Sequence, residues 1–253
     1  MMRNTLSVLL IWMSLLLTGC VSTDNKDRNP KAAAEKYVEI GLSYLQSGNR
    51  DQARFNLKKA VELDPKSAQV HHAKALLYQA DGEAPLAEKH FKRAVSLDRS
   101  FTQARSNYAR YLLLEGRAED SEAEYEKVIE DVNYRLRAQA FLGLGLARKR
   151  QNDYAGATEA FKRAYQRDQR TTRALLELAD LAMIEEDYVA AKGHLDQYEK
   201  LARATPRSLK LGLELAQIYD DSDSTASYSM SLRNLFPDSK EAREHILSLN
   251  GNQ

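Results

Sequence analysis

Small and apolar residues return along this chain at a fixed interval. Gly48, Gly82 and Gly116 lie 34 residues apart, and Ala53 and Ala87 share that interval. A constant period of this length is typical of stacked supersecondary units, in which each unit buries its apolar face against its neighbours. The pattern therefore predicts a row of similar units along most of the chain.

The stretch "YVEIGLSYLQSGNRDQARFNLKKAVELDP", residues 37–65, shows what one unit contains. One helix face is marked by the spacing i, i+3, i+4 and i+7, which Tyr37, Ile40, Gly41 and Tyr44 occupy. Gly48 and Asn49 then interrupt the pattern, and Asp51 can cap a second helix by accepting backbone N–H groups. The stripe of that second helix is formed by Ala53, Leu57 and Ala60. Each unit is thus predicted to be a helical hairpin.

This hairpin pattern with its 34-residue period resembles the tetratricopeptide repeat. The resemblance implies an all-α fold, a right-handed superhelix of about six repeats and a capping helix. The expected repeats are residues 34–67, 68–101, 102–135, 138–171, 172–205 and a divergent 206–239, with the capping helix at about 239–249. The third repeat has the weakest pattern, because Ser121 stands where alanine is expected.

The N-terminal segment contains "LLLTGCVS", residues 15–22, with Cys20 as the one cysteine of the chain. One cysteine cannot form an internal disulfide. Arg3, the apolar run from Leu6 to Leu17 and the small residues before Cys20 follow the order of a secretory signal, and together with Cys20 they resemble the bacterial lipobox. The alternative is a plain signal peptide with an incidental cysteine.

The lipobox resemblance implies that residues 1–19 are a lipoprotein signal peptide and that Cys20 is the lipid attachment site. Residues 20–33 would then form the lipidated cysteine and a flexible tether, and residues 34–249 the repeat domain. Val21 follows the cysteine in place of the aspartate that retains lipoproteins at the inner membrane. We therefore expect a lipid-anchored protein at the periplasmic face of the outer membrane.

The charge balance argues against nucleic acid as a partner. The chain has 37 basic and 36 acidic residues, and removal of residues 1–19 takes away one arginine and no acid, which leaves 36 of each. A nucleic-acid-binding protein normally carries a basic excess. The local run Arg148-Lys149-Arg150 is interpreted as a solvated helix end, where cations complement the helix dipole.

No set of residues in the sequence resembles an active site or a cofactor site. Gly143 and Gly145 lie inside a predicted helix and follow no strand, so they do not form a nucleotide loop. His71 and His72 are neighbours on a predicted helix and point in different directions, which makes them a poor metal clamp. We expect a protein without enzymatic activity, cofactor, metal or small-molecule substrate.

Partner binding is expected in the groove formed by the first helices of the repeats. The side chains predicted to face that groove are Val38, Leu42, Leu45, His72, Leu76, Leu142 and Leu146. Most are apolar although helix packing does not require it, and an exposed apolar patch in a monomer usually marks a binding site. A helix or strand of a partner could cover this patch. The alternative is that the tether or a neighbouring helix covers it.

The C-terminal stretch "SLKLGLELAQIYDDSDSTASYSMSLRNLFPDSKE" gives the most specific resemblance, to the type IV pilus biogenesis/stability proteins (PilW/PilF). The matching positions are Gly212, Asp223, Ala226, Ser227, Tyr228, Leu232 and Pro237. Membership in this family implies a pilotin, which binds a secretin subunit of the pilus machinery, brings it to the outer membrane and helps the channel to assemble.

Two other functions share the same architecture. One is a different periplasmic repeat scaffold, such as a lipoprotein of outer-membrane β-barrel assembly, and the C-terminal resemblance argues against it. The other is an enzyme of the cell wall or a regulator of such enzymes. An enzyme would need a pocket of converging polar residues, which the sequence does not indicate, and for a regulator a pulldown would return hydrolases instead of a secretin.

Overall fold

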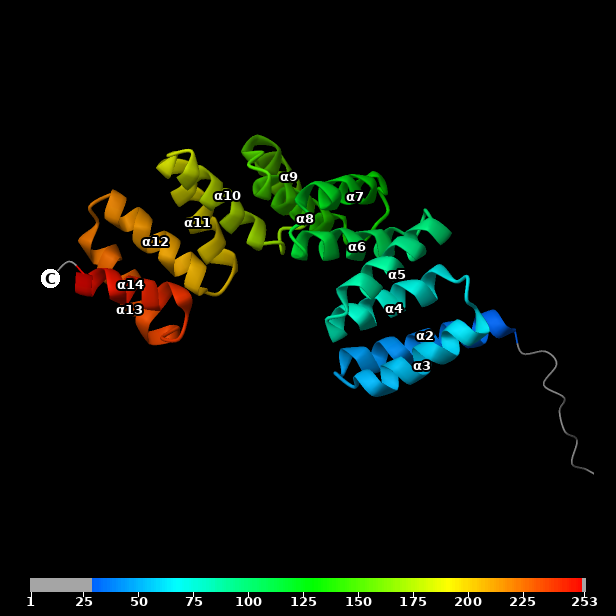
Figure 1. Cartoon of the computed structure of the whole chain (residues 1–253). Coiled ribbons are helices and arrows are strands. Elements are labelled where there is room, and N and C mark those ends of the chain that lie inside the picture. The colour runs from blue at the N-terminus through cyan, green and yellow to red at the C-terminus, as the bar shows by residue number, and fades with distance from the viewer. Residues whose placement is uncertain (1–28, 252–253) are drawn as a thin grey trace, which may run out of the picture. The chain divides into compact units, whose positions relative to one another are not determined.

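The structure is a computed structural model that describes residues 29–251. Every regular element in this range is an α-helix, which confirms the predicted all-α tetratricopeptide-repeat fold (Figure 1). The described chain divides between Lys66 and Ser67 into two compact units. We call α2 (Pro30–Gln46) and α3 (Arg50–Leu63) the N-terminal hairpin, and the helices from α4 (Ala68–Asp81) to α14 (Lys240–Gly251) the main repeat unit. The predicted signal peptide and Cys20 lie outside the described residues.

The N-terminal hairpin begins earlier than the sequence predicts. Asn29 caps α2 by accepting the backbone N–H of Lys31 at 3.1 Å, and Pro30 takes the first helical position. Residues 30–33, which the sequence assigns to the tether, are therefore helical. The cap of α3 also differs from the prediction. Asn49 rather than Asp51 caps this helix, and its side-chain oxygen accepts the backbone N–H of Gln52 at 3.2 Å.

The close packing of α2 on α3 depends on Gly41. A β-carbon at Gly41 would lie 2.8 Å from Cδ2 of Leu57, well inside van der Waals contact. Gly41 is buried, but Ile40 and Tyr44 of the same predicted stripe are 44% and 37% exposed. Since α2 is the first helix in the described range, no earlier described hairpin covers this side of it.

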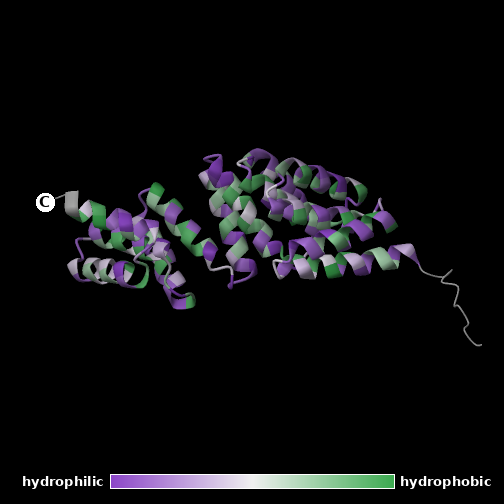
Figure 2. Ribbon diagram, turned by 60° about the horizontal axis from the view of Figure 1, so that its bottom comes forward, coloured by the Kyte–Doolittle hydropathy of each residue, from purple (hydrophilic) through white to green (hydrophobic). Residues whose placement is uncertain are grey.

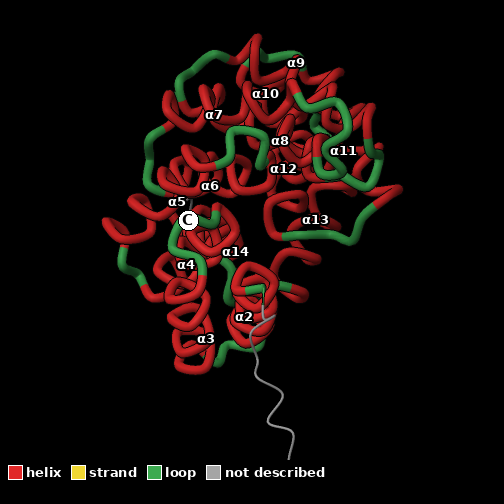
Figure 3. The backbone as a smooth tube through the Cα atoms, turned by 90° about the vertical axis from the view of Figure 1, so that its right-hand side faces the viewer, coloured by secondary structure: helices red, strands yellow, loops and turns green. Residues whose placement is uncertain are grey.

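The main repeat unit contains five pairs of helices and the final helix α14 (Figures 1 and 3). The pairs are α4 with α5 (Ala84–Leu97), α6 (Thr102–Leu114) with α7 (Ala118–Glu130), α8 (Arg137–Arg150) with α9 (Tyr154–Arg167), α10 (Arg173–Ile184) with α11 (Tyr188–Leu201), and α12 (Pro206–Ile218) with α13 (Ser222–Leu235). Short turns join the two helices of each pair, so the partners run antiparallel.

The turn inside each pair uses one backbone conformation throughout. Gly82 and Gly116 have φ angles of 77° and 80°, in the left-handed region that glycine adopts without strain. The next three turns place Asn152, Glu186 and Asp220 there, with φ angles of 63°, 59° and 53°. The left-handed turn conformation therefore recurs in every pair, including the last three, in which another residue stands in place of glycine.

Second helices carry the largest buried side chains. Phe91 of α5 and Phe161 of α9 are fully buried, and Gly145 of α8 lies where a β-carbon would overlap the Phe161 ring. Ser121, which weakens the third repeat in the sequence, is also fully buried, and its hydroxyl donates to the carbonyl of Ala109 at 2.8 Å. This hydrogen bond satisfies the polar group, so serine fits a position that alanine holds elsewhere.

Hydrophobic and hydrophilic residues alternate around the helices, as expected of elements that bury one side (Figure 2). None of the helices between residues 29 and 251 combines the length and the hydropathy needed to cross a bilayer.

Candidate partner-binding groove

A groove opens between α6 and α8 in the main repeat unit. Its volume is about 530 Å³, and its walls come from α6, α7, α8, the loop before α8 and the first turn of α10. Five leucines and three arginines line the groove. The leucines are Leu113, Leu114, Leu136, Leu142 and Leu146, and the arginines are Arg110, Arg150 and Arg173.

A glycine in α8 shapes one wall of the groove. A β-carbon at Gly143 would overlap the ring of Tyr125, so the absence of a side chain lets this tyrosine of α7 reach the groove. Burial raises the pKa of Tyr125 to about 12, although the charge of Arg110 acts in the opposite direction. The phenol therefore stays protonated near neutral pH and remains able to donate a hydrogen bond.

Leucine side chains form the apolar part of the groove. Leu142 is buried and Leu146 is half-buried, and both belong to the predicted groove residues. Leu114 at the end of α6 is 64% exposed, and Leu136 in the loop before α8 is 52% exposed. Because Leu136 is one of the two residues inserted between the third and fourth repeats, the insertion adds an apolar side chain to the groove.

Three arginines and no carboxylate line the groove, so its formal charge is +3. Arg110 and Arg150 form no ion pair with any residue from 29 to 251. Arg150 donates instead to the main-chain carbonyl of Leu113, which carries no compensating charge. Arg173 has a partner, but its Nε lies 3.4 Å from the nearer carboxylate oxygen of Glu177. The positive charge of the groove is therefore only partly neutralised.

The three consecutive cations at the end of α8 reach three different helices. Arg148 pairs with two glutamates of α7 at 2.7 and 2.9 Å, and Lys149 pairs with two acids of α10 at 3.0 and 3.1 Å. Arg150 bonds to α6 through the carbonyl of Leu113. The interpretation of this run as a solvated helix end is therefore wrong, because each side chain links α8 to a neighbour.

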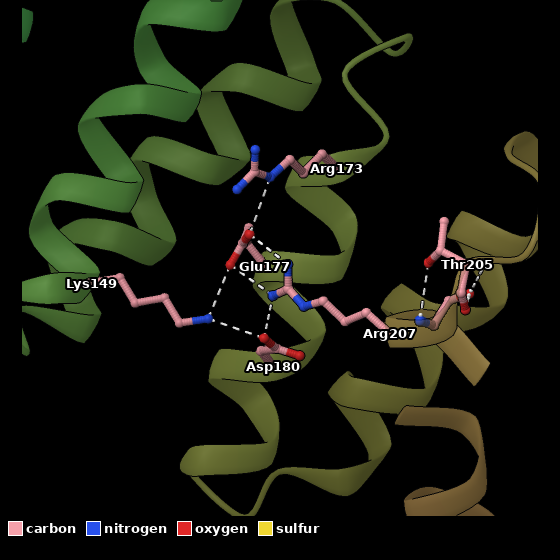
Figure 4. A network of polar contacts seen from close by, with 7 residues as sticks. Lys149, Arg173, Glu177, Asp180, Thr205 and Arg207 are labelled. Carbon is pink, nitrogen blue, oxygen red and sulfur yellow. Dashed lines mark hydrogen bonds and ion pairs between the residues drawn. The ribbon is translucent and has the colours of Figure 1, made fainter. Parts of the chain in front are cut away.

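A buried carboxylate connects α8, α10 and α12 next to Arg173 (Figure 4). Glu177 accepts hydrogen bonds from both terminal nitrogens of Arg207 at 2.7 and 2.8 Å and from Lys149 at 3.0 Å. Asp180 also contacts Lys149 and Arg207. Burial raises the pKa of Glu177, but the hydrogen bonds and charges of Arg207 and Lys149 outweigh it and hold the pKa at about 2. The carboxylate is therefore ionised at neutral pH.

The predicted patch near the N-terminus does not form part of this groove. Val38 is 7% exposed and is a core residue, which corrects its prediction as a groove-facing side chain. Leu42 and Leu45 are half-buried on α2, in the N-terminal hairpin. Leu76 is half-buried on α4 and packs against the core cluster that contains Phe91.

His72 is a core residue and does not face the groove, contrary to the prediction. It is 5% exposed, its Nε2 lies 2.8 Å from Nδ2 of Asn107, and its ring packs edge-on against Phe101. Burial lowers the pKa of His72 to about 4, so the imidazole is neutral near pH 7 and Nε2 accepts from the amide. The adjacent His71 makes a separate contact, with Nδ1 of His90 at 2.9 Å. No group of three or more metal-ligating side chains occurs in the part of the chain that the structure describes.

Sequence reasoning missed Arg110, Leu114 and Leu136 as groove residues. Leu136 lies in the insertion, which the repeat register leaves without an assigned role. The available signal was that the insertion places an apolar residue between two arginines, in "RLR", residues 135–137. Arg110 could be placed on the groove side, but only the structure shows that no acid neutralises it.

Models of the tetratricopeptide repeat match residues 72–140 and 142–208, and a second repeat model matches residues 41–82. The chain is 32% identical over 243 residues to the type IV pilus assembly protein PilF of Pseudomonas aeruginosa, which covers 94% of this chain and 96% of PilF. A protein of Haemophilus influenzae is 31% identical over 126 residues, 50% of this chain and 70% of that protein.

Solved structures also show similarity to type IV pilus proteins. The structure of Pseudomonas aeruginosa PilF superposes with a TM-score of 0.79 at 33% identity and covers 87% of this chain and 99% of PilF. PilW, described as a widely conserved type IV pilus biogenesis factor, shares the fold with a TM-score of 0.77 at 22% identity, over 84% of this chain and 98% of PilW. The chain therefore belongs to the type IV pilus biogenesis family of tetratricopeptide-repeat proteins that includes PilF.

Proposed function

We propose that this protein is the pilotin of a type IV pilus machinery, an outer-membrane lipoprotein that binds secretin subunits and promotes their assembly into the channel. The observation that carries the proposal is the similarity to the pilus assembly protein PilF along 94% of the chain. The protein acts by binding and placement, and it needs no catalytic group, cofactor or nucleic acid.

The proposed anchor is the acylated Cys20, exposed as the new N-terminus after residues 1–19 are removed. More than one acyl chain is needed for stable anchoring, since each buried CH₂ contributes about 0.8 kcal/mol. Val21 in place of aspartate directs the lipoprotein to the outer membrane in this proposal. The repeats then stand in the periplasm, where secretin subunits pass.

The proposed work of the repeats is to cover apolar surface of an unassembled secretin subunit. The leucines of the groove between α6 and α8 supply an apolar contact, and protein recognition of this kind often seats a helix or an extended strand. Holding several subunits at one membrane raises their effective concentration, which favours multimers without any new contact between them.

The proposal is tested by following secretin multimers. The gene is deleted, membranes are fractionated, and unboiled samples are run on a denaturing gel with a secretin antibody. A second strain carries Cys20→Ser, which removes the proposed lipid site and leaves the repeats unchanged. We expect multimers to disappear in the deletion strain and to be misplaced in the Cys20→Ser strain.

Normal amounts of multimer at the outer membrane in both strains would refute the pilotin role. The client would then be another protein, and a scaffold for outer-membrane β-barrel assembly or a cell-wall enzyme regulator becomes the better hypothesis. Pulldown with the full chain separates these two, because the first returns assembly factors and the second returns hydrolases.

A further inference from the structure

We propose that the groove between α6 and α8 binds an acidic peptide segment of the client protein, in which large apolar side chains alternate with carboxylates. The inference rests on the proposed function and adds the chemistry of the bound segment. It follows from two properties of the groove that occur together, its exposed leucines and its unneutralised arginines.

The leucines account for the apolar side chains of the segment. Leu114 and Leu136 are more than half exposed, and both border the same hollow as Leu146. Single exposed leucines are common on protein surfaces, but several around one concave site are not. The volume of about 530 Å³ falls in the range of ligand sites, which is roughly 300–1,000 Å³.

The arginines account for the carboxylates. Arg110 and Arg150 lack an acidic partner in the range 29–251, and the lining contributes no acid of its own. Arg173 shares Glu177 with Arg207, which already holds both carboxylate oxygens at 2.7 and 2.8 Å. A planar guanidinium with free N–H groups matches a carboxylate in a two-point contact. A segment bearing acids therefore complements the charges of Arg110 and Arg150.

The remaining lining suits a polypeptide main chain. Gln103 and Ser106 of α6 line the groove, and their side chains can both donate and accept hydrogen bonds. An extended segment presents N–H and C=O groups that need such partners. The site thus offers one kind of contact for each part of a peptide: leucines for apolar side chains, arginines for acids and polar side chains for the backbone.

The test uses the full chain in detergent micelles and two fluorescein-labelled peptides. One peptide alternates leucine with glutamate, and the other has lysine in place of glutamate. Fluorescence anisotropy gives the affinity of each. We expect the glutamate peptide to bind and the lysine peptide to bind at least about tenfold more weakly, because like charges repel and every 1.4 kcal/mol is a factor of ten. No binding of the glutamate peptide, or equal binding of the two, overturns the proposal.

Two variants locate the site. Arg110→Glu reverses one groove charge and Leu136→Asp replaces an exposed apolar contact, and neither side chain is buried. Both should weaken binding of the glutamate peptide about tenfold. The matched controls are Arg167→Glu on α9 and Val189→Asp on α11, which change exposed residues outside the groove and should leave the affinity unchanged. Equal losses in variants and controls would show that the peptide binds elsewhere.

The same variants separate this inference from the pilotin role. If gene deletion abolishes secretin multimers but Arg110→Glu leaves them intact, the pilotin role stands and the groove is not the contact. If deletion has no effect on multimers, the pilotin role fails whatever the peptides do. If Arg110→Glu instead changes the mass of the protein in sedimentation, the groove is occupied by a second copy of the chain, and the inference of a client segment is overturned.

Discussion

Arg207 and Glu177 form a two-point ion pair, in which the two terminal nitrogens of the guanidinium donate to separate carboxylate oxygens at 2.7 and 2.8 Å. Glu177 occupies the repeat position that Ala73 holds in the second repeat and Gly143 holds in the fourth. All three positions are buried. A charge at such a position must be paired, so α10 and α12 are joined here by a salt bridge where the second and fourth repeats have small residues.

Replacing Glu177 with glutamine should destabilise the fold. Glu177→Gln keeps the size of the side chain and removes one of the two carboxylates that contact Arg207 and Lys149, while Asp180 still contacts both. Because a buried hydrogen bond to a charged group contributes roughly 1.5–3 kcal/mol, we expect a loss in that range. The measurement is the free energy of unfolding from urea titration. Glu159→Gln, which breaks the exposed pair of Glu159 with Arg163, should cost less than about 1 kcal/mol. Equal costs would show that the network adds no stability.

Acidification should destabilise the protein through His72. Burial lowers the pKa of the folded imidazole to about 4, below its ordinary 6.5. Between these values the unfolded chain binds a proton that the folded chain does not, so stability is highest above pH 6.5 and falls as the pH falls toward 4. His72→Gln has no proton to take up, and its side chain can still accept from Asn107. The difference in free energy of unfolding between wild type and His72→Gln, measured by urea titration, should therefore be smaller at pH 5 than at about pH 7. A gap that stays constant would contradict this account.

Alanine at Gly143 should disturb the packing of α8 on α7. The added β-carbon would overlap the ring of Tyr125, and the tyrosine must move or the helices must separate. Overpacking of this kind costs about 1–3 kcal/mol. Gly193→Ala on α11 is the matched control, since nothing lies within 4 Å of its β-carbon and alanine is the better helix former by up to about 1 kcal/mol. Thermal unfolding should show a lower midpoint for the first variant and a higher one for the second.

The repeats could be predicted because their signal is local and periodic. Small residues such as Ala53, Ala87 and Ala157 recur where two helices approach closely, and all three are fully buried in the structure. The same logic fails at the edge of the array, where Ile40 matches a core position but is 44% exposed. Periodicity tells which face a residue occupies, but it cannot tell whether a neighbour covers that face.

Leu142 and Leu146 were predicted as groove residues, but the polar network and the rest of the groove could not be predicted from the sequence, for a different reason. Lys149, Glu177 and Arg207 belong to three successive repeats, and each one alone is compatible with a solvated surface position. Glu177 did carry a signal in the sequence, because it is an acid within the largely apolar stretch "RALLELADLAMI", residues 173–184. The shape of the groove depends on Gly143, whose lack of a side chain leaves room for Tyr125. Its positive charge depends on the lack of an acid among the lining residues near Arg110.

Glycine in place of Glu186 should stabilise the turn between α10 and α11. Glu186 has a φ angle of 59°, at the same point of the hairpin where Gly116 has 80°. A residue with a β-carbon loses roughly 1–2 kcal/mol in the left-handed region, and glycine avoids this strain at some cost in chain entropy. Urea titration of Glu186→Gly should give a gain of up to about 1 kcal/mol. Gly116→Ala introduces the strain instead and should lose about 1 kcal/mol, and a loss in both variants would show that Glu186 makes a compensating contact.

Secretin assembly should distinguish the groove from the N-terminal hairpin as the client-binding surface. Leu136→Asp places a negative charge in a groove proposed to receive acids, so multimers on unboiled gels should decrease in the strain that carries it. Leu42→Asp alters α2 in the N-terminal hairpin, where Leu42 is half-buried, so circular dichroism must first show that this variant is folded. If folded Leu42→Asp protein supports normal multimers and Leu136→Asp does not, the client contacts the main repeat unit. The opposite result would return the contact to α2 and to the leucines that the sequence first indicated.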